Sequence, residues 1–232
     1  MREGDLRLPG PGHLAMRLGE ATVGGDLHWE GHETCLVMFV HGSGSSRFSP
    51  RNQQVARAFH EAGYATLLFD LLTAGEDEED RRTARPRFDI ELLTRRVVAA
   101  VDWVRSRPAM GATPIVLFGA STGAAAALRA AALRPGVVAG VISRGGRPDL
   151  AGPALAQVRV PTCLIVGGRD TAVLSLNRGA YEHLRCERSL EVVAGAGHLF
   201  EEPGTLARVV AIALTFLERH VGRRALPARP GP

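Results

Sequence analysis

The chain has 232 residues, of which 45% are hydrophobic and 22% charged, a balance typical of one globular domain. All 28 of its basic residues are arginine and none is lysine, which excludes a Schiff-base enzyme, a Walker-type phosphate loop and a serine–lysine hydrolase. The net charge of only +4, with scattered arginines and 5% aromatic residues, argues against nucleic-acid binding.

Downstream of residue 34, short apolar runs alternate with stretches that have the 3.6-residue period of a helix. The expected strands are 35–40, 65–71, 114–119, 137–143, 162–167 and 190–193. The expected helices are 50–62, 90–107, 122–133 and 206–221. Apolar strands that alternate with helices predict a mainly parallel sheet covered by helices on both faces.

Two segments do not follow this alternation. Residues 14–17 and 26–29 predict a strand pair at the sheet edge, with Gly24 and Gly25 in its turn. Residues 73–87 are acidic, then basic, and without periodicity. This pattern predicts a surface loop, and its acidic run lacks the spacing of a calcium loop.

No linker interrupts residues 1–222, so one domain is expected, followed by a disordered tail over residues 223–232. No apolar run approaches the roughly 18 residues of a membrane span, and no leader-like segment opens the sequence. The cysteines lack metal-ligand spacing, so we expect the reducing cytoplasm, no metal and no cofactor. The three cysteines are Cys35, Cys163 and Cys186.

Residues 119–123 read Gly-Ala-Ser-Thr-Gly and place the pattern Gly-x-Ser-x-Gly at the junction of a predicted strand and a predicted helix. Such a turn forces the serine into a strained backbone conformation, and the small residues around it let strand and helix approach closely. Ser121 Oγ would then project above the sheet, and the Thr122 N–H would be one oxyanion donor. The simpler alternative is a glycine-rich turn with an inert serine.

A serine nucleophile needs a base, and the base needs an acid that orients it. His198 closely follows the last predicted strand, and Asp170 closely follows the strand before it. Because the carboxyl ends of parallel strands share one edge of a sheet, Ser121, Asp170 and His198 are expected to converge there. Asp149, which lies farther beyond its own strand, is the competing acid.

The first predicted strand leads into a glycine-rich loop, His41-Gly-Ser-Gly-Ser-Ser-Arg47, which can aim backbone N–H groups into the site. The Ser43 N–H is the candidate for the second oxyanion donor. His41 is expected to be structural and to form hydrogen bonds within the loop. A phosphate-binding loop is the rival interpretation, and the lack of lysine weakens it.

The ordered set of His41-Gly42, Gly-x-Ser121-x-Gly, Asp170 and His198 resembles the α/β-hydrolase superfamily over roughly residues 30–221. The compact size resembles its dienelactone-hydrolase-related group. The resemblance implies an α/β-hydrolase fold, a doubly wound sheet with helices on both faces, and a triad of Ser121, Asp170 and His198.

The chain also departs from some members of that superfamily. Dienelactone hydrolase itself has a cysteine nucleophile where this chain has Ser121. Only the short stretch 144–161 joins two late strands, so the cap domain of many lipases is not expected. Some relatives are joined to a phosphoribosyltransferase domain, which is not expected here.

These features predict a cofactor-free serine hydrolase that cleaves a carboxylic ester, lactone or thioester through an acyl-enzyme on Ser121. One alternative is acyl transfer to another acceptor by the same triad. A less favoured alternative is a non-catalytic binding module that retains the fold. Arg144 and Arg47 near the rim are candidate contacts for an anionic substrate, although a chain whose bases are all arginine would place some there anyway. The expected partner is a small-molecule ester, with the chain as a monomer or homodimer.

Overall fold

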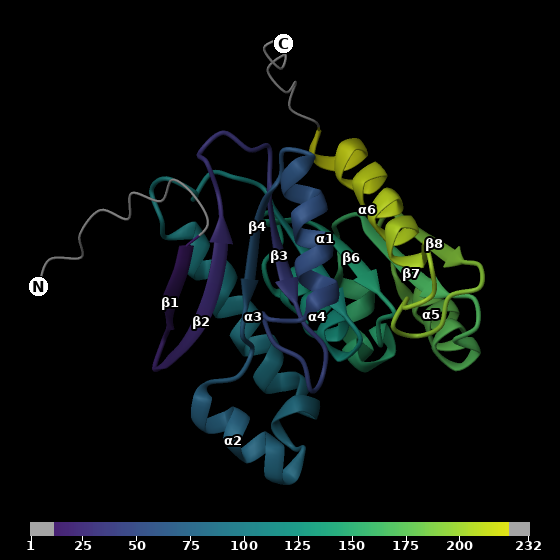
Figure 1. Cartoon of the computed structure of the whole chain (residues 1–232), viewed down its shortest axis with the longest axis horizontal. Coiled ribbons are helices and arrows are strands. Elements are labelled where there is room, and N and C mark those ends of the chain that lie inside the picture. The colour runs from purple at the N-terminus through teal and green to yellow at the C-terminus, as the bar shows by residue number, and fades with distance from the viewer. Residues whose placement is uncertain (1–11, 223–232) are drawn as a thin grey trace, which may run out of the picture.

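An eight-stranded sheet forms the centre of the computed structural model, which describes residues 12–222 (Figure 1). The strand order is β1-β2-β4-β3-β5-β6-β7-β8, with β3 to β8 parallel and with β1 and β2 antiparallel at one edge. The strands are β1 (Gly12–Leu18), β2 (Ala21–His28), β3 (Leu36–Val40), β4 (Ala65–Phe69), β5 (Ile115–Ala120), β6 (Val138–Arg144), β7 (Thr162–Gly167) and β8 (Arg188–Val193). The mainly parallel sheet predicted from the sequence is confirmed.

Helices cover both faces of this sheet, as predicted (Figure 1). One face carries α1 (Pro50–Glu61) and α6 (Thr205–Val221), and the other carries α3 (Ile90–Arg105), α4 (Thr122–Leu133) and α5 (Thr171–His183). Successive residues of a strand point to opposite faces, so each central strand serves both cores. In β3, Val37 and Phe39 pack with α1 and α6, whereas Leu36 and Met38 pack with α3 and α4.

The local sequence explains where α1 begins and ends. The Ser49 hydroxyl accepts a hydrogen bond from the Asn52 N–H at 3.4 Å, and Pro50 occupies the first turn, where its missing N–H costs nothing. Gly63, with φ of +85°, follows the last turn. The predicted helix 50–62 is confirmed to within one residue.

The turn predicted at Gly24 and Gly25 is wrong. The β1–β2 hairpin turns at Gly19 and Glu20, and both Gly24 and Gly25 lie inside β2. Gly24 serves a close approach instead, because a Cβ there would lie 2.6 Å from the Arg47 guanidinium. The glycine pair therefore marks a contact with the loop after β3 and not a change of chain direction.

The surface loop predicted over residues 73–87 is also wrong, because this segment contains helix α2 (Ala74–Thr83). Thr73 and Glu76 form a capping box: Thr73 Oγ1 accepts from the Glu76 N–H at 3.3 Å, and the Glu76 carboxylate accepts from the Thr73 N–H at 2.7 Å. Arg81 pairs with Asp77 one turn earlier at 2.6 Å. Capping and charge pairs hold this helix, so hydrophobic periodicity did not reveal it.

The connection from β6 to β7 is a short 3-10 stretch, η2 (Pro148–Gln157), which packs against α4 and α5. No cap domain is present within residues 12–222, as expected. In the same range, no helix combines the length and apolar character needed to cross a membrane. Residues 1–11 and the tail predicted over residues 223–232 lie outside the described part of the chain.

Candidate active site

The sequence-predicted site residues lie at the end of a parallel strand or in the loop that follows one. Ser43 lies in the loop after β3, Ser121 directly follows β5, and Arg144 is the last residue of β6. Asp170 follows β7 and His198 follows β8. All of them therefore lie at the carboxyl edge of the sheet, where ligands bind in folds of this class.

Ser121 occupies a strained turn between β5 and α4. Its φ and ψ are 48° and −124°, a left-handed conformation that L-residues adopt rarely. A Cβ on Gly119 would lie 2.5 Å from Ala124 Cα, and one on Gly123 would lie 2.2 Å from the Val40 carbonyl oxygen. Glycine is therefore required on both sides of the serine, because strand and helix backbones are in contact there.

The turn is also fixed by the loop that follows β6. The Ser121 carbonyl accepts from the Arg147 N–H at 2.9 Å, and the Ser121 N–H donates to the Arg144 carbonyl at 3.4 Å. A Cβ on the adjacent Gly145 would lie 2.9 Å from the His198 carbonyl oxygen. Ser121 and His198 thus flank the same short segment, although they are far apart in sequence.

His198 and Asp170 form a hydrogen bond, with 2.6 Å between His198 Nδ1 and Asp170 Oδ2. The Asp170 side chain is 14% exposed and that of His198 is 37% exposed, so the imidazole reaches solvent while its partner is shielded. The competing acid, Asp149, has both carboxylate oxygens paired with Arg147, at 2.9 and 2.8 Å. The histidine is therefore oriented by Asp170 and not by Asp149.

A second carboxylate holds the loop that carries His198. Glu202 Oε1 accepts from the Gly197 N–H at 2.9 Å and lies 3.3 Å from the Arg169 guanidinium. Hydrogen bonds from the backbone N–H groups of Glu202 itself and Gly197 lower the pKa of the Glu202 carboxyl, so it is ionised at neutral pH. The His198 loop is thereby tied to the residue that precedes Asp170.

The two predicted oxyanion donors are neighbours, but one of them already has an acceptor. The Ser43 N–H donates to the Thr122 hydroxyl oxygen at 2.9 Å. Thr122 is the first residue of α4, and the first N–H groups of a helix have no intrahelical partner. An oxyanion at this position would therefore either share the Ser43 N–H with the Thr122 hydroxyl or replace the hydroxyl as the acceptor of that N–H.

His41 has the structural role that the sequence predicts. Its Nε2 accepts from the Leu71 N–H at 3.1 Å, so Nδ1 carries the proton and donates to the Gly42 carbonyl at 3.0 Å. Burial lowers the pKa of His41, which keeps the ring neutral as both bonds require. The imidazole thus joins the Ser43 loop to the end of β4.

A cavity of about 310 Å³ opens beside the Ser43 loop, and α2 forms its opposite wall. Asp77, Arg81 and Arg87 line it from the α2 side. The Arg87 Nε donates to the Asp80 carboxylate at 2.7 Å, and Asp80 is only 3% exposed. The segment that was expected to be a plain loop is therefore an ordered wall next to the candidate oxyanion site.

The two arginines proposed as substrate contacts differ in their pairing. Arg47 forms an ion pair with Asp70 and lies 3.5 Å from Asp26, so the protein itself neutralises its charge. Arg144 is only 8% exposed, and its Nη1 is buried without a hydrogen-bond partner in the described residues. Burial, together with the nearby cation of Arg51, lowers the pKa of Arg144 to about 10.

Three supporting residues were not found from the sequence. Arg51 lies near Arg144, Glu202 holds the His198 loop, and the buried Asn177 donates from Nδ2 to the Gly146 carbonyl at 2.9 Å. Arg51 and Asn177 act on segments distant in the chain, whereas Glu202 acts on a residue five positions before it; none of the three belongs to a motif. Of the three, only Glu202 could have been suspected from the local sequence, because the doublet Glu201-Glu202 closely follows His198.

Comparisons with known proteins agree with this fold. Residues 37–147 match the alpha/beta hydrolase family. The crystal structure of a dienelactone hydrolase from Anabaena variabilis is 48% identical, covers 91% of this chain and 99% of its own, and superimposes with a TM-score of 0.88. A dienelactone hydrolase-like promiscuous phosphotriesterase from metagenomic libraries is 16% identical, with coverage of 91% and 98% and a TM-score of 0.73, a likeness of fold alone.

Two curated proteins of Mycobacterium tuberculosis, provisionally named phosphoribosyl transferases, are 49% identical over 214 residues, which is 92% of this chain and 46% of theirs. The chain thus spans about half the length of these curated relatives. The solved structure, by contrast, is matched along almost its whole length. The chain belongs to the α/β-hydrolase family and is related to dienelactone hydrolase.

Proposed function

We propose that the protein is a serine hydrolase that cleaves a carboxylic ester, lactone or thioester through an acyl-enzyme on Ser121. The observation that carries the proposal is the Asp170–His198 hydrogen bond of 2.6 Å at the edge of the sheet where Ser121 occupies its strained turn. Orientation of a histidine by a shielded carboxylate is what a serine nucleophile requires. The coarser assignment, a hydrolase, follows from the family.

In the proposed reaction, Ser121 Oγ attacks the carbonyl carbon while His198 Nε2 accepts its proton. Asp170 holds the Nδ1–H and stabilises the imidazolium that forms. The N–H groups of Thr122 and Ser43 bind the oxyanion, and the Ser43 N–H turns toward it from the Thr122 hydroxyl. His198 then protonates the leaving group, and water activated by the same histidine releases the acyl group from Ser121.

Steady-state and burst kinetics on p-nitrophenyl esters test this assignment. Wild type should release a burst of nitrophenol that matches the enzyme concentration, and Ser121→Ala and His198→Asn should each lower kcat by about 10⁴-fold or more. Added alcohols or amines that divert the acyl group completely would indicate acyl transfer. A folded wild type without turnover on any ester would contradict the proposal and favour a binding module.

The unpaired Arg144 supports an anionic group on the substrate. Within residues 12–222 no carboxylate pairs with the buried Arg144 guanidinium, which is costly, and a second cation, Arg51, raises that cost. An anion held by Arg144 would offset it through charge-assisted hydrogen bonds. Arg47 is the weaker candidate of the two, because its charge is already paired with Asp70.

A matched pair of substrates separates this role from a structural one. Arg144→Met should raise KM for a carboxylated ester about tenfold or more and leave KM for its neutral counterpart nearly unchanged. Arg47→Met serves as the comparison variant. Equal changes for both esters in Arg144→Met would assign the residue to structure and remove the anionic subsite.

The remaining expectations belong to the same proposal. The substrate is a small molecule, the working form is a monomer or homodimer, and no nucleic acid takes part. The three cysteines are free and buried, and burial raises the pKa of Cys35 to about 12 and that of Cys163 to about 11. Buried free thiols without disulfides fit a reducing cytoplasm.

A further inference from the structure

A cluster of three potential metal ligands lies at the edge of the sheet opposite Ser121. His28 is the last residue of β2, and its register partner is Thr66, near the start of β4. His60 lies in the last turn of α1, which returns to this edge, and Glu30 lies in the loop after β2. Three separate segments therefore bring these side chains together, far from the candidate active site.

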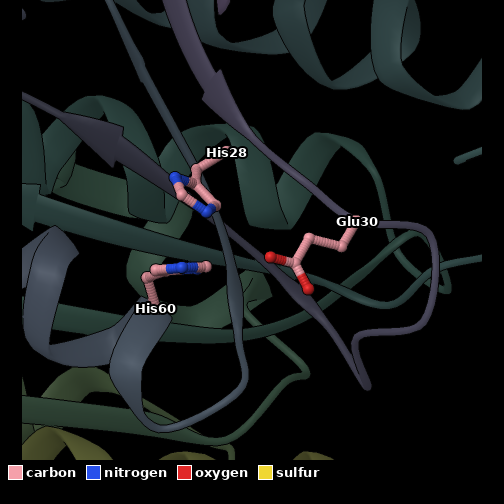
Figure 2. A group of neighbouring side chains, drawn as sticks. All are labelled: His28, Glu30 and His60. Carbon is pink, nitrogen blue, oxygen red and sulfur yellow. The ribbon is translucent and has the colours of Figure 1, made fainter. Parts of the chain in front are cut away.

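The side chains converge closely (Figure 2). One potential ligand atom from each of His28, Glu30 and His60 lies within 4.8 Å of the other two. The centroids of the two imidazole rings are 3.3 Å apart, with 48° between the ring planes. Figure 2 shows the Glu30 carboxylate directed toward the space beside both rings.

Two imidazoles and one carboxylate form a recognised ligand set for divalent transition metals, with water completing the coordination. A zinc ion at about 2.1 Å from each ligand holds them roughly 3.4 Å apart. The half-exposed Glu30 side chain can move to close the remaining gap, although its Oε2 also lies 3.2 Å from His32 Nε2. Hard cations such as magnesium prefer an all-oxygen set.

The electrostatics also suit a cation. The carboxylates of Glu30 and Glu33 both lie near His28. A bound divalent ion would offset the negative charge of these two carboxylates.

A cavity of about 380 Å³ opens next to the two histidines, between the β1–β2 pair and α1. His13 and Asp26 line it from the strands, and Gln53 and Arg57 line it from α1, two turns and one turn before His60 respectively. A metal held by His28, Glu30 and His60 would therefore have an open side that faces this cavity. That is the arrangement of a site that keeps water or a ligand on the metal, rather than of a closed structural site.

We propose that His28, Glu30 and His60 bind one divalent transition-metal ion, with zinc as the reference ion and an open coordination position toward the cavity. This site is separate from the proposed hydrolase site and does not depend on it. It departs from the expectation of no metal drawn from the sequence, because the two histidines are 32 positions apart and match no ligand motif.

Calorimetric titration of the chelator-treated full chain with Zn²⁺ tests the site. Wild type should bind one ion per chain, and His60→Gln and Glu30→Gln should each weaken binding by about 10- to 100-fold or more. Glu30 is exposed, so its variant tests the ligand role with little risk to folding. His183→Gln is the control, because His183 lies in α5 and contacts the Gly179 carbonyl at 2.7 Å.

Cobalt(II) provides a second readout that does not use activity. Its visible absorption bands should appear on binding to wild type and be lost in His60→Gln. Zinc binding that is unchanged in both His60→Gln and Glu30→Gln would overturn the proposal, as would binding that is lost only in His198→Asn. Absence of one-site binding in folded wild type would also overturn it and leave the cluster as a stacked histidine pair.

Discussion

Two segments border the candidate active site at the same edge of the sheet, and different forces hold them. The turn from Gly119 to Gly123 is held by backbone atoms in contact, with glycine at the points where any side chain would collide. The α2 segment is held by charged side chains: Asp80 with Arg87 and Glu76 with Arg96, the latter at 2.8 Å. Steric contacts respond little to pH or salt, whereas ion pairs respond to both.

The two kinds of stabilisation, steric contact in the nucleophile turn and ion pairs in α2, suit the different roles of the two segments. The nucleophile must keep one backbone conformation, which close contact enforces. The wall of the neighbouring cavity needs only to stay in place, and a set of ion pairs is sufficient for that. We therefore expect conditions that loosen α2 to leave the nucleophile turn intact.

The largest expected effect comes from breaking the steric contact. In Gly123→Ala the new Cβ would lie 2.2 Å from the Val40 oxygen and 2.3 Å from the His41 oxygen, so the backbones must separate. We expect a loss of about 3–5 kcal/mol in the free energy of unfolding, measured by urea denaturation. Gly179→Ala in α5 is the matched control, since a Cβ there meets nothing within 4 Å. Its stability should be unchanged or slightly raised; similar losses in both variants would contradict the steric account.

A smaller effect is expected when the α2 ion pair is broken. Asp80→Asn leaves Arg87 without its carboxylate, and we expect a loss of about 1–3 kcal/mol by urea denaturation. Asp77→Asn, whose Arg81 pair is exposed, should cost about 0.5 kcal/mol or less. Equal costs for the two variants would remove the distinction between the buried and the exposed pair.

Protonation of the Asp80 carboxylate is expected to weaken α2 at low pH. Desolvation alone would raise the pKa of Asp80, but hydrogen bonds from the Arg87 side chain and N–H leave it below the ordinary value of 3.8. A lowered pKa means that this stabilisation is complete above about pH 4 and is lost as the pH falls further. The fraction of time that α2 is open, obtained from hydrogen exchange after division by the intrinsic exchange rate at each pH, should therefore rise below pH 4 in wild type. It should respond less to pH in Asp80→Asn. Identical pH responses would contradict this assignment.

The smallest expected effect is on the pH dependence of stability and concerns His41, which links the Ser43 loop to the end of β4 through hydrogen bonds of its neutral ring. Its pKa is below 6.5 in the folded protein, so its contribution to stability is complete above pH 6.5 and declines as the pH falls. Thermal unfolding between pH 7.5 and 5 should show a shallower pH dependence in His41→Gln than in wild type. His28 and His220 also have lowered pKa values, but they are present in both proteins. Parallel curves would show that His41 does not titrate as inferred.

Sequence patterns predicted the parts of this molecule whose cause is local. The strands around Ser121 are uninterrupted apolar runs, and the Gly-x-Ser-x-Gly turn is defined within five residues, so both could be predicted. The positions of Asp170 and His198 followed from a general property of parallel sheets, that their carboxyl ends share one edge. Their mutual hydrogen bond is the geometric outcome of that property.

Features that depend on distant partners could not be predicted in this way. Helix α2 has no apolar stripe, and Arg87 and Arg96 join it from later in the chain. Gly24 and Gly25 had the composition of a turn, but Gly24 accommodates the Arg47 guanidinium. The lack of a hydrogen-bond partner for Arg144 Nη1 among residues 12–222 and the meeting of His28 with His60 are likewise set by tertiary packing.

The central claim, that Ser121 is an activated nucleophile, is tested most directly with a fluorophosphonate probe. The probe reacts covalently with activated serines, and mass spectrometry locates the modified peptide. We predict a single adduct on Ser121 in wild type, its loss in Ser121→Ala and a strongly reduced rate in His198→Asn. Folded wild-type protein that forms no adduct, or forms it on another serine, would contradict the account.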